Sequence, residues 1–185
     1  MKEITDEKSS KLLSKFLEES GLHKKDFAQM VGVTLSYVYN LIDNTIPFST
    51  RSTTLERIAT VMDVKPEVFE EYRLPQEPII TDESIDYIKK AIKKKGMTVV
   101  DFLKSFPRTK RLDIVDILRG ALPVPVDYNE LKYMGEVIGL NNDEIFNIWE
   151  KRFRQVLDTN GMNVYSNIEL INKMTDCAKK YSSTK

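Results

Sequence analysis

The stretch from Lys24 to Ile42, KKDFAQMVGVTLSYVYNLI, constrains the fold of this chain more than any other. Its apolar residues recur at helical spacing on both sides of Gly32 and predict two short helices joined by a tight turn. Gly32 can adopt the left-handed conformation that ends a helix without steric cost, and Thr34 is a good N-cap for the helix that follows. The residues expected to face the core are Phe27, Ala28, Val31, Val38 and Leu41. Those left for contact with something outside are Ser36, Tyr37, Tyr39 and Asn40.

The length and composition indicate a soluble, cytoplasmic protein. A chain of 185 residues suits one large domain or two small ones, and a charged fraction of 30% is typical of globular proteins. No apolar run approaches the roughly 18–20 residues that cross a bilayer, so we expect no membrane contact. The N-terminus, MKEITDEKSS, lacks the apolar core of a signal peptide. Cys177 is the only cysteine, which excludes an internal disulfide and fits a reducing compartment.

The residues that carry catalysis or bind metals are scarce. With His23 as the only histidine and Cys177 as the only cysteine, no zinc site of the usual N/S type can form, and we expect no metal and no cofactor. Paired carboxylates occur without a nucleophile or base beside them, and no glycine-rich phosphate loop is present. We therefore expect no enzyme. His23 is interpreted as a surface residue, and Cys177 as a small apolar filler.

Residues 1–74 have the pattern of a small all-α domain. An amphipathic helix is expected from about Lys8 to Ser20, followed by the two helices of the central motif. A fourth helix is marked by Leu55, Ile58, Ala59 and Met62. Pro66 suits the first turn of a fifth short helix carrying Val68, Phe69 and Tyr72. Two prolines in the segment that follows indicate a linker over residues 75–81.

The same pattern returns further along the chain. Asp101-Phe102 repeats Asp26-Phe27 at a spacing of 75 residues. At a spacing of 76, Val38 and Leu41 are matched by Ile114 and Ile117. In the fourth helix, Leu55, Ile58 and Met62 are matched by Leu131, Met134 and Ile138. This spacing is too long for a solenoid and suits a duplicated domain over residues 82–158. Residues 159–185 would add a C-terminal helix and tail, packed on the second domain or on a partner chain.

The second copy departs from the first at its turn and on its outer face. Pro107 stands in the place of Gly32, and the second helix of the pair would expose Asp113 and Asp116, which repel phosphate. The favoured interpretation is that this copy serves packing or dimerisation. A second interpretation stays open, namely phosphate contacts from the basic residues that open this helix, Arg108, Lys110 and Arg111.

The central motif resembles the phage-repressor-like helix-turn-helix family, of the lambda repressor and Cro type, also called the XRE type. The resemblance extends over Leu12 to Tyr72 and, through fewer identities, over Ile85 to Phe146. Members mostly bind operator DNA as dimers, with the third helix in the major groove. The resemblance thus implies an all-α chain of two tandem five-helix domains, the second degenerate, plus a C-terminal helix. It implies a sequence-specific transcriptional regulator, a repressor before an activator, whose partners are double-stranded DNA and a second copy.

The resemblance also assigns roles to individual residues. The base edges would be read by Leu35, Ser36 and Asn40; asparagine can pair with adenine, and leucine can meet a thymine methyl group. The DNA backbone would be contacted by Lys24, Thr34, Tyr37, Asn44 and Thr45. Lys24 stands where the family usually places a glutamine that touches phosphate at a helix N-terminus. Where several members have a charged pair between the first and third helices, this chain has Leu17 and Ile42.

The charge distribution keeps other functions open. Residues 1–74 carry 10 basic and 12 acidic side chains, residues 75–150 carry 11 and 13, and the formal net charge of the chain is zero. A protein-interaction module of the same fold, such as an antitoxin or a protein that captures a regulator, is therefore the alternative function. In a third interpretation both copies contact DNA. The lysines at 89, 90, 93, 94 and 95 would then supply phosphate contacts, although a solvated face is the default for such a run.

Overall fold

The structure is a computed structural model that describes residues 7–48, 52–72 and 82–160, together with residues 168, 169, 172–174, 176 and 180 of the C-terminal segment. Every regular element in these ranges is a helix, which confirms the all-α expectation. No helix in these ranges combines the length and the apolar character needed to span a membrane.

The first group of helices comprises α1 (Glu7–Ser20), α2 (Lys24–Val31), α3 (Leu35–Ile42), α4 (Ser52–Val61) and the 3₁₀ turn η1 (Pro66–Val68). The five residues expected to face the core are all buried. The fifth element differs from the expectation, because only Pro66–Val68 is helical and Val68 is exposed. Phe69 reaches the core from just beyond the turn and stacks on Phe48, with ring centroids 5.6 Å apart.

The turn between α2 and α3 forms as its residues predict. Gly32 has a φ of 77°, in the left-handed region, and its amide donates to the carbonyl of Ala28. The Thr34 hydroxyl accepts a hydrogen bond from the Tyr37 amide at 3.2 Å and caps α3. A glycine C-cap and a threonine N-cap satisfy backbone groups that would otherwise lack partners at the two helix ends. These two caps therefore fix the angle between α2 and α3.

The second group comprises α5 (Glu83–Lys94), α6 (Val99–Lys104), α7 (Arg108–Leu118), α8 (Tyr128–Ile138) and α9 (Asn142–Thr159). Side-chain caps start four of these helices, from Asp82, Thr98, Asp127 and Asn141. The residues matched to the first copy lie on corresponding helices and are buried: Phe102, Ile114, Ile117, Leu131, Met134 and Ile138. The last element breaks the correspondence, since α9 has 18 residues and η1 has 3.

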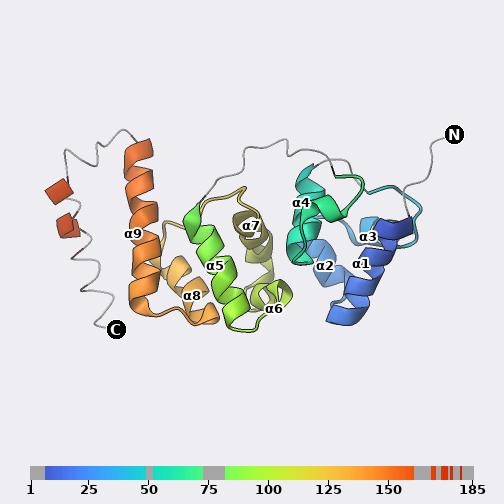
Figure 1. The fold of residues 1–185 in the computed structure, drawn as a ribbon, viewed down its shortest axis with the longest axis horizontal. Helices are drawn as coiled ribbons and strands as arrows, with labels where there is room; N and C mark the ends of the chain where they lie inside the picture. Colours follow the sequence, from blue (N-terminus) through green and yellow to red (C-terminus); the bar gives the residue numbers. More distant parts are fainter. Residues whose placement is uncertain are drawn as a thin grey trace.

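The two groups pack against each other through α7. In Figure 1, α1 and α9 lie toward opposite ends of the molecule, with α6 and α7 between α9 and the first group. Helix α7 contacts both α2 and α4. Leu112 lies so close to the α2–α3 turn that a Cβ added to Gly32 would sit 3.0 Å from its side chain. The interface therefore includes the turn of the first motif itself.

Four charged side chains form a network at this interface: Glu56 and Arg57 on α4, Asp116 on α7 and Arg119 just after it. Arg57 donates two hydrogen bonds to the carboxylate of Asp116, at 2.8 and 2.7 Å. Arg119 donates to Asp116 and to Glu56, both at 2.7 Å. Each carboxylate thus has a guanidinium partner, as buried charges require.

Asp116 corrects one sequence expectation. It points away from its own group of helices, but α4 covers it and only 8% of the residue is exposed, so the expectation of a phosphate-repelling surface carboxylate is wrong here. Burial by itself would raise the pKa of Asp116. The hydrogen bonds and charges of Arg57 and Arg119 outweigh burial and hold that pKa below its usual value.

The expected linker at 75–81 lies outside the described residues, as do Cys177 and residues 181–185. Within the C-terminal segment, the residues that the structure describes are helical, and Ile168 and Met174 are exposed. Arg154 of α9 donates a hydrogen bond to the side chain of Asn172 at 3.0 Å, which brings this part of the segment beside α9.

Candidate nucleic-acid interface

The outer face of α3 is open along its whole length. On the inner face, Val38 and Leu41 are fully buried. On the opposite side lie Leu35, Ser36, Tyr39 and Asn40, which we call the α3 outer face; all are exposed, Leu35 at 38% and Tyr39 at 46%. Residues four apart lie one above the other on a helix, so these four side chains form one continuous patch. Among the residues that the structure describes, the side chains of Ser36 and Asn40 have no hydrogen-bond partner.

Lys24 brings a positive charge to the edge of this patch. It is the first residue of α2, and its ammonium lies 5.2 Å from the centroid of the Tyr39 ring. Such a cation–π contact holds the side chain over α3. The N-cap residue of α2, His23, makes no side-chain hydrogen bond to the helix amides. A lysine and uncapped helix amides together favour an anion at this position.

Thr34 and Tyr37 have structural roles of their own. The Thr34 hydroxyl is engaged as the N-cap of α3, and Tyr37 is half-buried against the core. Both lie at the start of α3, beside Leu35. Contacts from these two residues to a DNA backbone stay a prediction.

Asn44 and Thr45 behave differently from each other. Asn44 has a φ of 53° and is half-buried, and its side-chain oxygen accepts a long hydrogen bond, 3.5 Å, from Ser10 of α1. Thr45 is exposed and donates through its hydroxyl to the carbonyl of Asn40 at 3.1 Å. The structure therefore brings Thr45 to the end of the α3 outer face and turns the Asn44 oxygen toward α1.

The three basic residues that open α7 are all engaged by protein groups. Arg108 pairs with Asp26 of α2 at 3.1 Å. Lys110 pairs with Glu130 at 2.9 Å, and this hydrogen bond raises the pKa of Lys110. Arg111 donates to the carbonyls of Phe106 and Lys104. The side chains of Arg108 and Lys110 are nevertheless 58% and 53% exposed, so phosphate contacts from this helix stay a prediction.

The lysine run of α5 is divided among several surroundings. Lys93 lies 3.6 Å from Asp63 of the first group, and Lys95 donates to the carbonyl of Val137 at the end of α8. Lys94 lines a hollow between α5 and the α8–α9 turn. These lysines therefore point in different directions instead of forming one stripe.

Sequence reasoning missed the role of α7 as the contact between the two groups. Its outward residues Arg108, Leu112, Asp116 and Arg119, which we call the α7 stripe, follow helical spacing and meet α2 and α4. The sequence held a signal, since four of the five residues in 114–118, IVDIL, are apolar, and all five are buried in the structure. A helix that is apolar around most of its circumference is buried on more than one side.

Within the described ranges, no three histidine, cysteine, aspartate or glutamate side chains are grouped so that they could hold a metal ion. Comparison of the chain with protein-family models, curated proteins and solved structures finds no match. The family resemblance therefore rests on the residues of the motif and on the geometry described above.

Proposed function

We propose that this protein is a sequence-specific DNA-binding transcriptional regulator, a repressor, that reads the major groove with α3. One observation carries the proposal. The α3 outer face is exposed and uncharged, whereas the α7 stripe, apart from the exposed Arg108, is covered by the first group of helices. A short helix with a buried inner face and an open polar outer face is the element that helix-turn-helix proteins insert into DNA.

Each residue of the interface has a distinct part in this mechanism. Asn40 pairs with an adenine edge, Ser36 donates to or accepts from a neighbouring base, and Leu35 meets a thymine methyl group. Lys24 and the amides at the start of α2 hold a backbone phosphate at the edge of the same groove. These contacts divide into base readout and positioning, and mutations should separate the two.

The second group of helices acts as a brace in this proposal. Because α7 packs on α2 and on the α2–α3 turn, the second group holds the first motif in place. A homodimer formed through the C-terminal part would set the distance between two half-sites. A symmetric operator with a fixed half-site spacing is the expected consequence.

The decisive experiment selects binding sites from a random DNA library with the purified full-length protein and then titrates salt on the enriched sequence. We expect an enriched, two-fold symmetric motif whose affinity falls steeply with salt. Lys24→Ala should weaken binding to all sequences alike and reduce the salt slope by about 1, as expected for one lost phosphate contact. Lys65→Ala, which removes an exposed lysine after α4, is the matched control and should leave the slope unchanged.

A protein-interaction module is the second candidate, and one observation favours it. The α3 outer face presents Leu35 and Tyr39, two large apolar side chains, in a chain of zero formal net charge. Such residues suit a protein partner as well as a DNA groove. If no DNA is enriched even at low salt, the DNA proposal fails. Partner capture that is lost in Leu35→Ala and retained in Lys24→Ala would then support the second candidate.

A further inference from the structure

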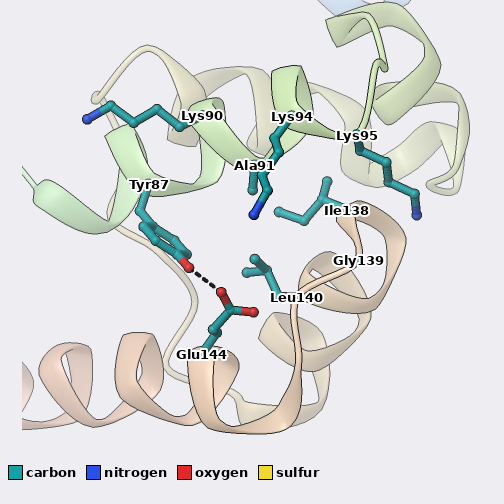
Figure 2. Close-up of a pocket in the computed structure, with 9 residues that line it drawn as sticks. All are labelled: Tyr87, Lys90, Ala91, Lys94, Lys95, Ile138, Gly139, Leu140 and Glu144. Carbon is teal, nitrogen blue, oxygen red and sulfur yellow. Dashed lines mark hydrogen bonds between the residues drawn. The ribbon is translucent and has the colours of Figure 1, made fainter.

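A hollow of about 370 Å³ opens between α5 and the turn from α8 to α9. Figure 2 shows Tyr87, Ala91 and Lys94 on one side, facing Ile138, Leu140 and Glu144 on the other. We call it the α5–α9 hollow. Its size falls in the range of about 300–1,000 Å³ typical of small-ligand sites, and well-packed interiors leave few gaps as large as this.

Two small residues keep the hollow open. Ala91 lies on α5 between Ile88 and Ile92, which are both buried in the core. Gly139 ends α8 with a φ of 78°, a conformation that a side chain would strain, and so it adds no bulk opposite α5. The space therefore follows from the residues that line it and from the way α8 ends.

The acidic side of the hollow is fixed by the protein. Glu144 accepts hydrogen bonds from the Tyr87 hydroxyl and from the Asn141 amide, as part of the capping box of α9. The hydrogen bond from Tyr87, followed by that from Asn141, holds the pKa of Glu144 below its usual value, so the carboxylate is ionised at neutral pH. The Tyr87–Glu144 pair forms a wall that separates this hollow from a smaller one lined by Glu83, Asn147 and Lys151.

Lys94 is the charged group that remains available. It makes no hydrogen bond and no ion pair within 4 Å to any residue that the structure describes. Figure 2 shows its ammonium extending into the hollow above Ile138 and Leu140, whereas Lys90 extends away from it. Lys95 is held at the rim by the carbonyl of Val137. The hollow thus combines one inward-directed cation with an apolar floor and with the Glu144 carboxylate, whose pKa the charge of Lys94 also lowers.

We propose that the α5–α9 hollow binds a small amphipathic carboxylate, with the carboxylate on the Lys94 ammonium and an apolar chain of a few carbon atoms on Ala91, Ile138 and Leu140. Complementarity argues for this class of ligand. The exposed Lys94 ammonium favours an anion, and a hydrocarbon chain would cover the parts of the half-buried Ala91 and Leu140 that still contact water. This site is separate from the α3 outer face, since it is built entirely from α5, α8, α9 and the α8–α9 turn.

The test is direct binding of hexanoate to the full-length protein, followed by the methyl NMR signals of Ile138 and Leu140, with hexan-1-ol as the probe that lacks the carboxylate. We expect saturable shifts with a Kd of about 1 mM for hexanoate, as suits a ligand of this size, and weaker binding of the alcohol. Lys94→Gln should weaken hexanoate binding about tenfold, as expected when one charge-assisted hydrogen bond is lost. Lys89→Gln removes an exposed lysine of the same helix that does not line the hollow, and should leave Kd unchanged.

Three results would overturn the proposal: no saturable shift with hexanoate, equal affinity for hexan-1-ol, or the same loss of affinity in Lys89→Gln as in Lys94→Gln. Ala91→Leu fills the hollow and should abolish binding. If that variant does not fold, the comparison of the two probes and the two lysine variants still decides. No DNA is involved in the measurement, so its outcome is independent of the DNA-binding proposal.

Discussion

The motif of α2 and α3 and the motif of α6 and α7 use similar helical frames in opposite ways. In the first, the four residues of the α3 outer face are exposed and uncharged. In the second, the α7 stripe is charged and meets α2 and α4, where Asp116 and Arg119 are buried. A frame of this kind can therefore present a helix to solvent or use it as an internal contact. The residues outside the shared core decide which.

The turns of the two motifs also differ in what holds them, which is local hydrogen bonding in the first and contacts with the other group in the second. The α2–α3 turn has a left-handed glycine and a threonine cap, which fix the helix angle through backbone hydrogen bonds. Before α7 the chain has Pro107, which supplies no side-chain cap, and α7 relies on contacts with the first group. The first motif is thus ordered mainly by local interactions, and the second in part by tertiary ones.

The largest expected effect on stability comes from disrupting the buried charge network between α4 and α7. Arg119→Ala leaves Glu56 and Asp116 each without one guanidinium partner, and should lower the free energy of unfolding by about 3–5 kcal/mol. Arg108→Ala removes an exposed pair at the same interface and should cost no more than about 1 kcal/mol. Urea denaturation of both variants measures the difference. Equal losses would mean that the network contributes no more than a surface pair.

A second experiment contrasts the outer residues of α3 and α7 directly. Asn40→Ala should cost about 1–3 kcal/mol of binding free energy at a single base pair of the selected DNA site. Asp113→Ala, on the exposed side of α7, should leave the sequence preference unchanged. Binding measured on single-base variants of the site distinguishes the two. A uniform loss on every sequence for Asn40→Ala would remove its role in base reading.

Replacing the turn glycine sharpens the comparison of the turns. Gly32→Ala places a side chain in a left-handed conformation, at about 1–2 kcal/mol, and also meets Leu112 at 3.0 Å. Gly21→Ala imposes the same type of backbone strain, at a φ of 60°, where no atom lies within 4 Å of the added Cβ. We expect a larger loss of stability for Gly32→Ala by thermal denaturation. When Leu112→Ala is added, the loss of stability caused by Gly32→Ala should fall to that caused by Gly21→Ala. If the larger loss persists, α7 does not constrain the turn.

The smallest expected effect is on the pH dependence of stability in acid. The pKa of Asp116 is lower in the folded protein than its ordinary value of 3.8, so its contribution to stability is complete above that value and is lost as the pH falls through the folded pKa. Asp116→Asn should therefore show a shallower decline of stability below about pH 4, within the range expected for a paired carboxylate. Asp113→Asn is the control, and denaturant titrations at several pH values give the slopes. Parallel slopes for Asp116→Asn and the unmodified protein would contradict the pairing.

Local rules explain which features were predictable from the sequence. Gly32 and Thr34 were identified correctly because a helix end depends on the residues adjacent to it. The buried positions of α3 and α8 followed from periodicity, which reports the side of a helix that meets its own core. The α3 outer face could be located for the same reason, although its role stays a prediction.

The remaining features depend on residues far apart in the chain. Asp116 was placed on the surface because periodicity describes one core and cannot show a second group of helices arriving from outside. The Asn44 oxygen lies 3.5 Å from the hydroxyl of Ser10, 34 positions away, which donates its shorter hydrogen bond to the Leu41 carbonyl at 2.6 Å. The α5–α9 hollow joins Lys94 to Leu140 and Glu144, and no local pattern links these positions. Long-range contacts of this kind are what a single sequence leaves undetermined.

The charge network also has a consequence for the order of events during synthesis. Arg119 follows Glu56 by 63 positions. At about 5–20 residues per second, the ribosome makes Glu56 roughly 3–13 s before its partner exists. During that interval α4 has Glu56 and Arg57 on a face that α7 has yet to cover. The nascent first motif must keep that face hydrated, and final closure of the interface waits until translation has passed α7.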